Sequence, residues 1–231
     1  MYAIVMEAYI KEMSMKYLFI SLLIIGLAAP LFAQTDVPAH TFAFGDWSFD
    51  GPRLYQNDTD AAFAKVMIRI PQYDAMIYEF NIKYEGGAED GHGGVGIHLY
   101  VDNTAPAATL GAGNSYLLWL NYDVAPNDQD IPQGFSAQVY KSIDDDRMIL
   151  LHSISLDQYF YLLTEENLAH PIPFLIEVYE TGEIRIYDPT DPEMRVYYHF
   201  TIDNEELPLR GNWIVLRTNG MRASFSMGLD Q

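Results

Sequence analysis

Short segments in which every second residue is apolar or aromatic restrict the fold of this chain more than any other feature. The spacing is clear in Met76–Tyr84, and it recurs in Val95–Val101. A period of two residues is typical of a β-strand that buries one face. These segments predict an all-β protein. Further strands are expected at residues 64–70, 116–122, 135–141, 147–154 and 195–202.

Two glycine-containing turns predict β-hairpins near the end of the chain. Residues 174–187 contain two alternating runs that meet at Glu180–Glu183. Asn219–Gly220 separates Trp213–Thr218 from Met221–Leu229, and Asn-Gly is the strongest short hairpin signal. Both pairs are therefore expected to form antiparallel hairpins.

The number and spacing of the strands predict a two-layer architecture. About ten strands at this spacing indicate two packed antiparallel sheets, a jelly-roll sandwich with at most one short helix. That helix is expected over Leu156–Leu168, where Ser155 and Gln158 fit a capping box. The side chains expected between the sheets are Phe80, Ile82, Ile97, Leu99, Val178, Ile186, Val215 and Phe225.

Five segments distributed over residues 42–229 resemble the concanavalin A-like β-sandwiches, and the resemblance in apolar spacing and turns extends over most of this range. The laminin-G-like and laminarinase-like jelly rolls are the nearest comparison, and the resemblance supports fold better than activity. The segments that carry it are Trp47–Gly51, Gly94–His98, Phe174–Tyr187, Gly211–Thr218 and Ala223–Leu229.

The resemblance implies that a glycan would lie on the concave sheet, and aromatic residues with polar neighbours fit that role. Flat rings stack on sugars, and amide or carboxylate groups hydrogen-bond their edges. If these side chains share one face, that face is expected to bind a neutral polysaccharide. The alternative is an outer face that is merely rich in tyrosine, or one covered by a loop or a partner. The candidate residues are His98, Tyr100, Trp119, Asn121, Gln138, Tyr140, Glu177 and Tyr179.

No catalytic residue is assigned from the sequence. Laminarinase-like members of the fold carry Glu-x-Asp-x-x-Glu on one strand, and this motif is absent here. The nearest run, Glu177–Glu180, points its two acids to opposite faces of a regular strand. A carbohydrate-binding or surface-interaction module is therefore favoured. The alternatives are a glycoside hydrolase with carboxylates from different strands, and a structural envelope protein.

The relatives of this fold often hold calcium near the joined ends of the chain, which implies a structural Ca²⁺ as the inorganic partner. Hard oxygen ligands suit this ion. The acids nearest those ends are Asp46, Asp50 and Asp230, and they are the expected ligands. No other cofactor is indicated.

Charge and cysteine content exclude several classes. The chain holds 13 Lys and Arg against 32 Asp and Glu, a net charge of −19. Nucleic-acid binding needs a basic surface that displaces phosphate counterions, so it is excluded as a function. The sequence contains no cysteine, so disulfides are excluded as well.

The beginning of the chain predicts export to the periplasm or the extracellular space. Residues 15–33 have a basic start, an apolar run and a small-residue end, which is the layout of a signal peptide. The apolar run is shorter than the ~20 residues of a membrane-spanning helix, so no integral membrane segment is expected after processing. Residues 1–14 are expected to be a start codon assigned too early, or else a long n-region. Residues 34–41 form a short extension, and 42–231 a single sandwich domain.

We predict that translation begins at Met15 and that the exported protein begins at Gln34. The measurement is the intact mass of the exported protein. A mature protein that keeps residues before Ala33 would contradict this prediction.

Overall fold

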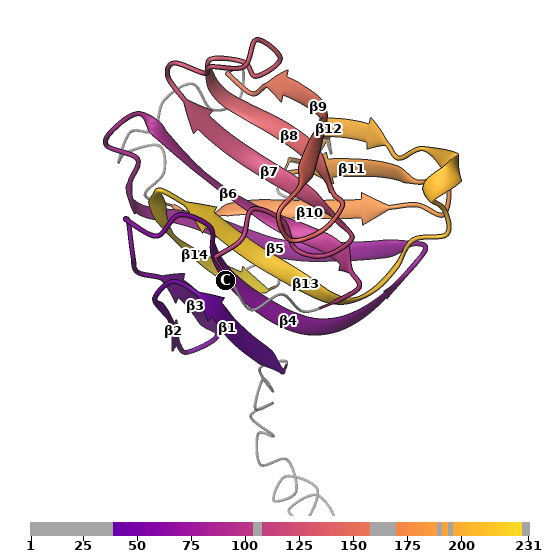
Figure 1. Cartoon of the computed structure of the whole chain (residues 1–231), viewed down its shortest axis with the longest axis horizontal. Coiled ribbons are helices and arrows are strands. Elements are labelled where there is room, and N and C mark those ends of the chain that lie inside the picture. Colours follow the sequence, from indigo (N-terminus) through magenta and orange to yellow (C-terminus); the bar gives the residue numbers. More distant parts are fainter. Residues whose placement is uncertain (1–38, 104–107, 158–169, 189–190, 194–195, 228–231) are drawn as a thin grey trace, which may run out of the picture. The chain divides into compact units, whose positions relative to one another are not determined.

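The computed structural model describes residues 39–103, 108–157, 170–188, 191–193 and 196–227. Over these residues the chain is all-β, and its strands form two antiparallel sheets of seven strands each (Figure 1). Sheet A contains, in spatial order, β1 (His40–Phe44), β4 (Ala64–Tyr73), β13 (Arg210–Asn219), β6 (His92–Val101), β7 (Ser115–Asp123), β8 (Gly134–Ser142) and β9 (Met148–Ser155). Sheet B contains β12 (Val196–Thr201), β11 (Glu183–Tyr187), β10 (Ile172–Val178), β5 (Met76–Gly87), β14 (Met221–Met227), β3 (Arg53–Gln56) and β2 (Trp47–Asp50). This arrangement confirms the predicted two-sheet sandwich.

Apolar side chains from the inner faces of both sheets form one buried cluster. Within it, Phe80 of β5 stacks on Phe174 of β10 with ring centroids 5.8 Å apart. Leu99 and Ile184 are completely excluded from solvent. The cluster contains all the predicted core residues except Val215: Phe80, Ile82, Ile97, Leu99, Val178, Ile186 and Phe225.

Val215 is buried on the opposite side of sheet A, so its predicted place between the sheets is wrong. Its neighbours on β13, Ile214 and Leu216, belong to the cluster between the sheets. Because three successive residues of β13 are apolar, a period of two does not identify the inner face here. On the outer face, the side turned away from sheet B, Val215 joins a second cluster with Met67, Val101 and Ala112.

The turn at Asn219–Gly220 connects the two sheets and does not form the predicted hairpin. β13 pairs with β4 and β6 in sheet A, whereas β14 pairs with β5 and β3 in sheet B. Gly220 has a φ of +64°, a conformation that glycine adopts readily. The Asn-Gly pair therefore provides a sharp change of direction, but the strands on either side pair with other partners.

The other predicted hairpin is confirmed. β10 and β11 are antiparallel neighbours, and the Tyr179 N–H donates to the Glu183 carbonyl at 2.9 Å. Most of the helix expected over 156–168 lies outside the described residues, which contain a single 3₁₀ turn at Asn204–Glu206. None of the described helices has the length and hydropathy needed to cross a membrane.

Phe80→Ala is expected to lower the free energy of unfolding by about 3–5 kcal/mol, because it leaves a cavity between the sheets. Chemical denaturation and the thermal midpoint both measure the effect. Ile77→Ala is the matched control, since Ile77 is on the same strand but 66% exposed. Equal midpoints for the wild type and Phe80→Ala would contradict the assigned inner face.

Candidate functional site

A groove of about 250 Å³ lies on the outer face of sheet A. The strands that contribute lining residues are β13, β7, β8 and β9. Leu118 and Leu120 of β7 pack between the sheets, so Trp119 between them points outward. The residues that line the groove are Phe63, Leu110, Leu117, Trp119, Tyr140, Met148, Arg217 and Asn219.

The indole of Trp119 lies across β6 because two glycines leave room for it. Trp119 is the register partner of Gly96. A Cβ placed on Gly94 would be 2.1 Å from Cζ2 of the indole, and one on Gly96 would be 2.9 Å from Cε3. The indole Nε1 donates to Asn121 Oδ1 at 3.0 Å, which fixes the orientation of the ring. The ring is therefore held parallel to the sheet rather than standing on it.

Tyr140 is held by a line of hydrogen bonds along β8. Its hydroxyl donates to Gln138 Oε1 at 2.6 Å, and Gln138 Nε2 donates to Ser136 Oγ at 2.9 Å. Burial raises the pKa of Tyr140 and outweighs the opposite effect of Arg217. The phenol therefore remains neutral at physiological pH.

The 109–114 segment packs on the outer face of sheet A beside the groove. Lys65 Nζ donates to Thr109 Oγ1 at 2.9 Å and to the Gly111 carbonyl. The Ala112 N–H donates to Ser142 Oγ at 3.0 Å. Burial, with a further contribution from the charge of Arg217, lowers the pKa of Lys65 to about 8. The segment covers the second apolar cluster and places Leu110 at the groove.

Arg217 is a buried cation in the floor of the groove, with an exposed fraction of 4%. Its Nη1 donates to the Leu110 carbonyl. Its guanidinium carbon is 4.8 Å from the ring centroid of Phe63 and 5.2 Å from that of Trp119. Burial lowers the pKa of the guanidinium to about 10, so it remains protonated at neutral pH. The groove therefore presents a positive charge beside two aromatic rings.

Five of the predicted site residues lie on this outer face of sheet A. Trp119 and Tyr140 line the groove, and Asn121 and Gln138 hold their rings. His98 has the same outward parity but is completely buried, and its Nδ1 is 3.0 Å from Ser115 Oγ. Burial, reinforced by the charges of Arg217 and Lys65, keeps the pKa of His98 well below its usual range.

Tyr100 does not share this face, and its prediction as an outward-facing residue is wrong. Its φ of +58° interrupts the alternation of β6, and its side chain joins the cluster between the sheets. The phenol hydroxyl donates to the Asp74 carbonyl at 3.0 Å. A bulge in the pairing of β6 with β13 lies at the same place. Sequence alternation does not reveal such a local reversal.

Glu177 and Tyr179 lie on the outer face of the other sheet, so the predicted single face is wrong. β10 belongs to sheet B, and its inward residues include Ile176 and Val178. The Tyr179 hydroxyl donates to Glu177 Oε2 at 2.6 Å. Alternation shows which residues of one strand share a side, but not which sheet the strand joins.

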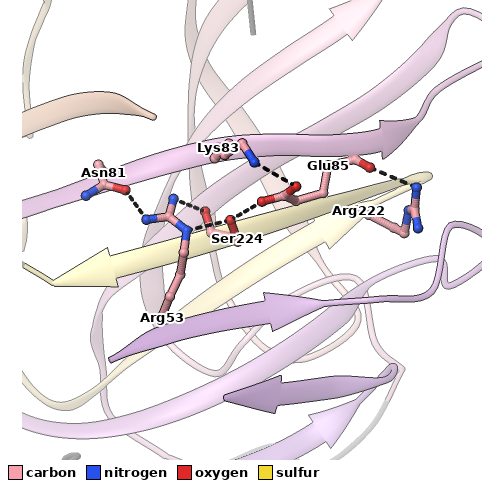
Figure 2. A network of polar contacts seen from close by, with 6 residues as sticks. All are labelled: Arg53, Asn81, Lys83, Glu85, Arg222 and Ser224. Atoms are coloured by element: carbon pink, nitrogen blue, oxygen red, sulfur yellow. Dashed lines mark hydrogen bonds and ion pairs between the residues drawn. The ribbon is translucent and has the colours of Figure 1, made fainter. Parts of the chain in front are cut away.

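The outer face of sheet B carries a polar network across β3, β5 and β14, which Figure 2 shows from close by. Arg53 uses all three of its guanidinium nitrogens, donating to Ser224 Oγ at 2.7 Å, to Asn81 Oδ1 at 2.8 Å and to the Ser224 carbonyl at 3.4 Å. Glu85 accepts from Ser224 Oγ at 2.6 Å and pairs with Lys83 at 3.1 Å. The charges of this network are thus used within the protein.

The calcium prediction receives no support from the part of the chain that the structure describes. Asp46 and Asp50 are exposed, and Asp230 lies outside the described residues. Nowhere in the described ranges do three or more His, Asp or Glu side chains gather in a group that would hold a metal ion.

Sequence reasoning missed several groove residues: Phe63, Leu110, Leu117, Met148, Arg217 and Asn219. Two signals were available. Arg217 is a cation that directly follows the apolar run Trp213–Leu216. Gly94 and Gly96 leave one face of their strand without side chains. Leu110 and Met148 could not be predicted as groove residues, because Leu110 is in a loop and Met148 begins a strand, and periodicity does not assign such positions to a face of a sheet.

No family model and no curated protein sequence matches this chain. Solved structures do match its fold. The carbohydrate-binding module CBM66 from Bacillus subtilis aligns with a TM-score of 0.54 at 13% identity, over 84% of this chain and 96% of that one. The carbohydrate recognition domain of Emp46p aligns with a TM-score of 0.54 at 12% identity, over 87% of this chain and 94% of that one. A Bacillus subtilis protein of unknown function with a galectin-like fold aligns with a TM-score of 0.52 at 13% identity, over 86% of this chain and 91% of that one. The chain therefore has a lectin-like β-sandwich fold.

Gly94→Ala is expected to destabilise the protein by about 1–3 kcal/mol, because its methyl group overlaps the Trp119 indole. In a Trp119→Ala background the same substitution should cost much less, giving a coupling energy of roughly 0.5–3 kcal/mol in a double-mutant cycle. Chemical denaturation of the four proteins measures this coupling.

Gly93→Ala is the control for this cycle, since a Cβ there would meet Ala88 instead, at 2.9 Å. It should show no coupling to Trp119→Ala. A cost for Gly94→Ala that is unaffected by Trp119→Ala would show that the indole does not lie on Gly94.

Proposed function

We propose that this protein is an exported, non-catalytic carbohydrate-binding domain and that the groove on sheet A is its glycan-binding site. The fold is shared with carbohydrate-binding modules and lectin-like domains, which supports a glycan as the partner. At 12–13% identity this likeness extends to the fold alone. The site assignment therefore rests on the groove itself.

The arrangement of Trp119 and Tyr140 carries the proposal. Both rings are fixed by hydrogen bonds before any ligand arrives, so little side-chain entropy is lost on binding. Aromatic side chains present an apolar surface to the C–H faces of sugars, and Asn219 adds an amide at the same groove. The volume of about 250 Å³ is below the ~300–1,000 Å³ of sites for drug-sized ligands, which suits one sugar unit of a longer chain.

The groove favours binding over hydrolysis. Most glycoside hydrolases place two carboxyl groups about 5–9.5 Å apart across the scissile bond. The described residues that line the groove include no Asp or Glu. Glu177, the carboxylate considered from the sequence, is on the outer face of sheet B. We therefore assign no catalytic role to this groove.

A glycan array with the purified protein tests the proposal, and reducing-sugar release is assayed in parallel. Tyr140→Ala should weaken binding several-fold, since a stacked ring contributes roughly 0.5–1.5 kcal/mol beyond its buried area. Trp119 is only 8% exposed, so Trp119→Ala should weaken binding through the changed shape of the groove. Circular dichroism checks that the variants fold. Tyr179→Ala is the matched control, because it removes an exposed ring from the other sheet.

Two results would contradict this proposal. If Tyr179→Ala abolishes binding while Tyr140→Ala leaves it intact, the ligand lies on sheet B. Release of reducing sugar that requires Glu177, tested with Glu177→Gln, would identify a hydrolase instead of a binding module.

A further inference from the structure

Arg217 is a buried cation that forms no ion pair with any described residue, in a protein whose net charge is −19. Within the described part of the chain no carboxylate is in ion-pair contact with it, and neither Nε nor Nη2 has a hydrogen-bond partner. Among the described residues, the oxygen that it contacts is the Leu110 carbonyl. Arg53 on sheet B differs, since all three of its guanidinium nitrogens are hydrogen-bonded.

An unpaired buried charge costs free energy, because the charge loses its hydration. The rings of Phe63 and Trp119 offset part of this cost through cation–π contacts. The 109–114 segment does not need the charge of Arg217 to stay in place, since Lys65 already donates hydrogen bonds to Thr109 and Gly111. The described residues thus supply no anionic partner for the charge of Arg217.

We propose that the groove selects anionic sugars, and that Arg217 binds the carboxylate or sulfate group of the ligand. Nε is enclosed by the protein, so Nη2 is the donor that remains for a ligand, and a guanidinium N–H forms a strong charge-assisted hydrogen bond with a carboxylate or sulfate oxygen. Nη1 remains on the Leu110 carbonyl. This inference rests on the proposed glycan-binding function and replaces the neutral polysaccharide expected from the sequence with an acidic one.

The charge distribution favours this selectivity. The described lining of the groove contains one cation and no carboxylate, although the protein as a whole is strongly acidic. Most of the acidic surface repels an anionic polymer, so electrostatic attraction favours its binding only where a local positive charge contacts it. A neutral sugar would leave the Arg217 charge unpaired.

The test uses two pairs of polymers that differ in charge. Polygalacturonate is compared with its methyl ester, and dextran sulfate with dextran, by affinity electrophoresis and calorimetry on the purified protein. At least one anionic polymer should bind ten-fold or more tightly than its neutral counterpart. The pair that shows the difference distinguishes a carboxylate from a sulfate. Arg217→Gln should remove the preference.

Lys65→Met is the matched control, because it removes the other cation that holds the 109–114 segment but does not line the groove. It should keep the preference for the anion. Equal loss of the preference in Lys65→Met and Arg217→Gln would show an effect through the segment and would overturn the contact with Arg217. If Arg217→Gln does not fold, the affinities of the wild type for the charged and neutral polymers still test the anion selectivity.

The failure of this inference differs from the failure of the proposed function. Equal affinity of the wild type for the charged and neutral members of both pairs overturns the anion selectivity and leaves glycan binding in place. If no polymer binds, and an array of neutral, uronate-bearing and sulfated glycans is also negative, both are overturned.

Discussion

The sandwich depends on burying one face of each sheet against the other. Trp47 and Phe225 of sheet B, for example, lie with their ring centroids 6.1 Å apart inside the shared cluster. Burial of apolar surface is the main favourable term in folding, and each sheet contacts the other through one face. The outer faces are therefore available for other roles, and the two sheets use them differently.

On sheet A the outer face is partly closed by a second layer, which turns a sheet surface into a groove. The 109–114 segment covers Met67, Val101 and Val215, and two cations hold its backbone oxygens. On sheet B the polar side chains hydrogen-bond one another across the strands, and no described segment covers them. The proposed site thus follows from the segment that covers one sheet and not from the sandwich alone.

The sequence allowed the strands and most inward faces to be predicted, because residues such as Phe80 and Leu99 alternate with polar neighbours. It did not allow the choice of sheet, since alternation is a property of one strand and pairing is not. Glu177 and Trp119 each alternate with inward-facing residues of their own strand, yet they lie on the outer faces of different sheets. The conformation of Tyr100 could not be predicted either, because a positive φ at a tyrosine has no signature in the amino-acid sequence.

The path of the chain from sheet A back to sheet B has a consequence for how the protein folds. β14 lies between β5 and β3, so sheet B remains in two separate parts until this late segment is in place. Arg53 and Ser224, which bond across β3 and β14, are 171 residues apart in the sequence. Closing so long a loop costs entropy before any contact compensates for it, and domains dominated by such pairings fold on a scale of about milliseconds to seconds. Sheet B is therefore complete only when β14 pairs with both β3 and β5, and without β14 the facing edges of these two strands have no partner.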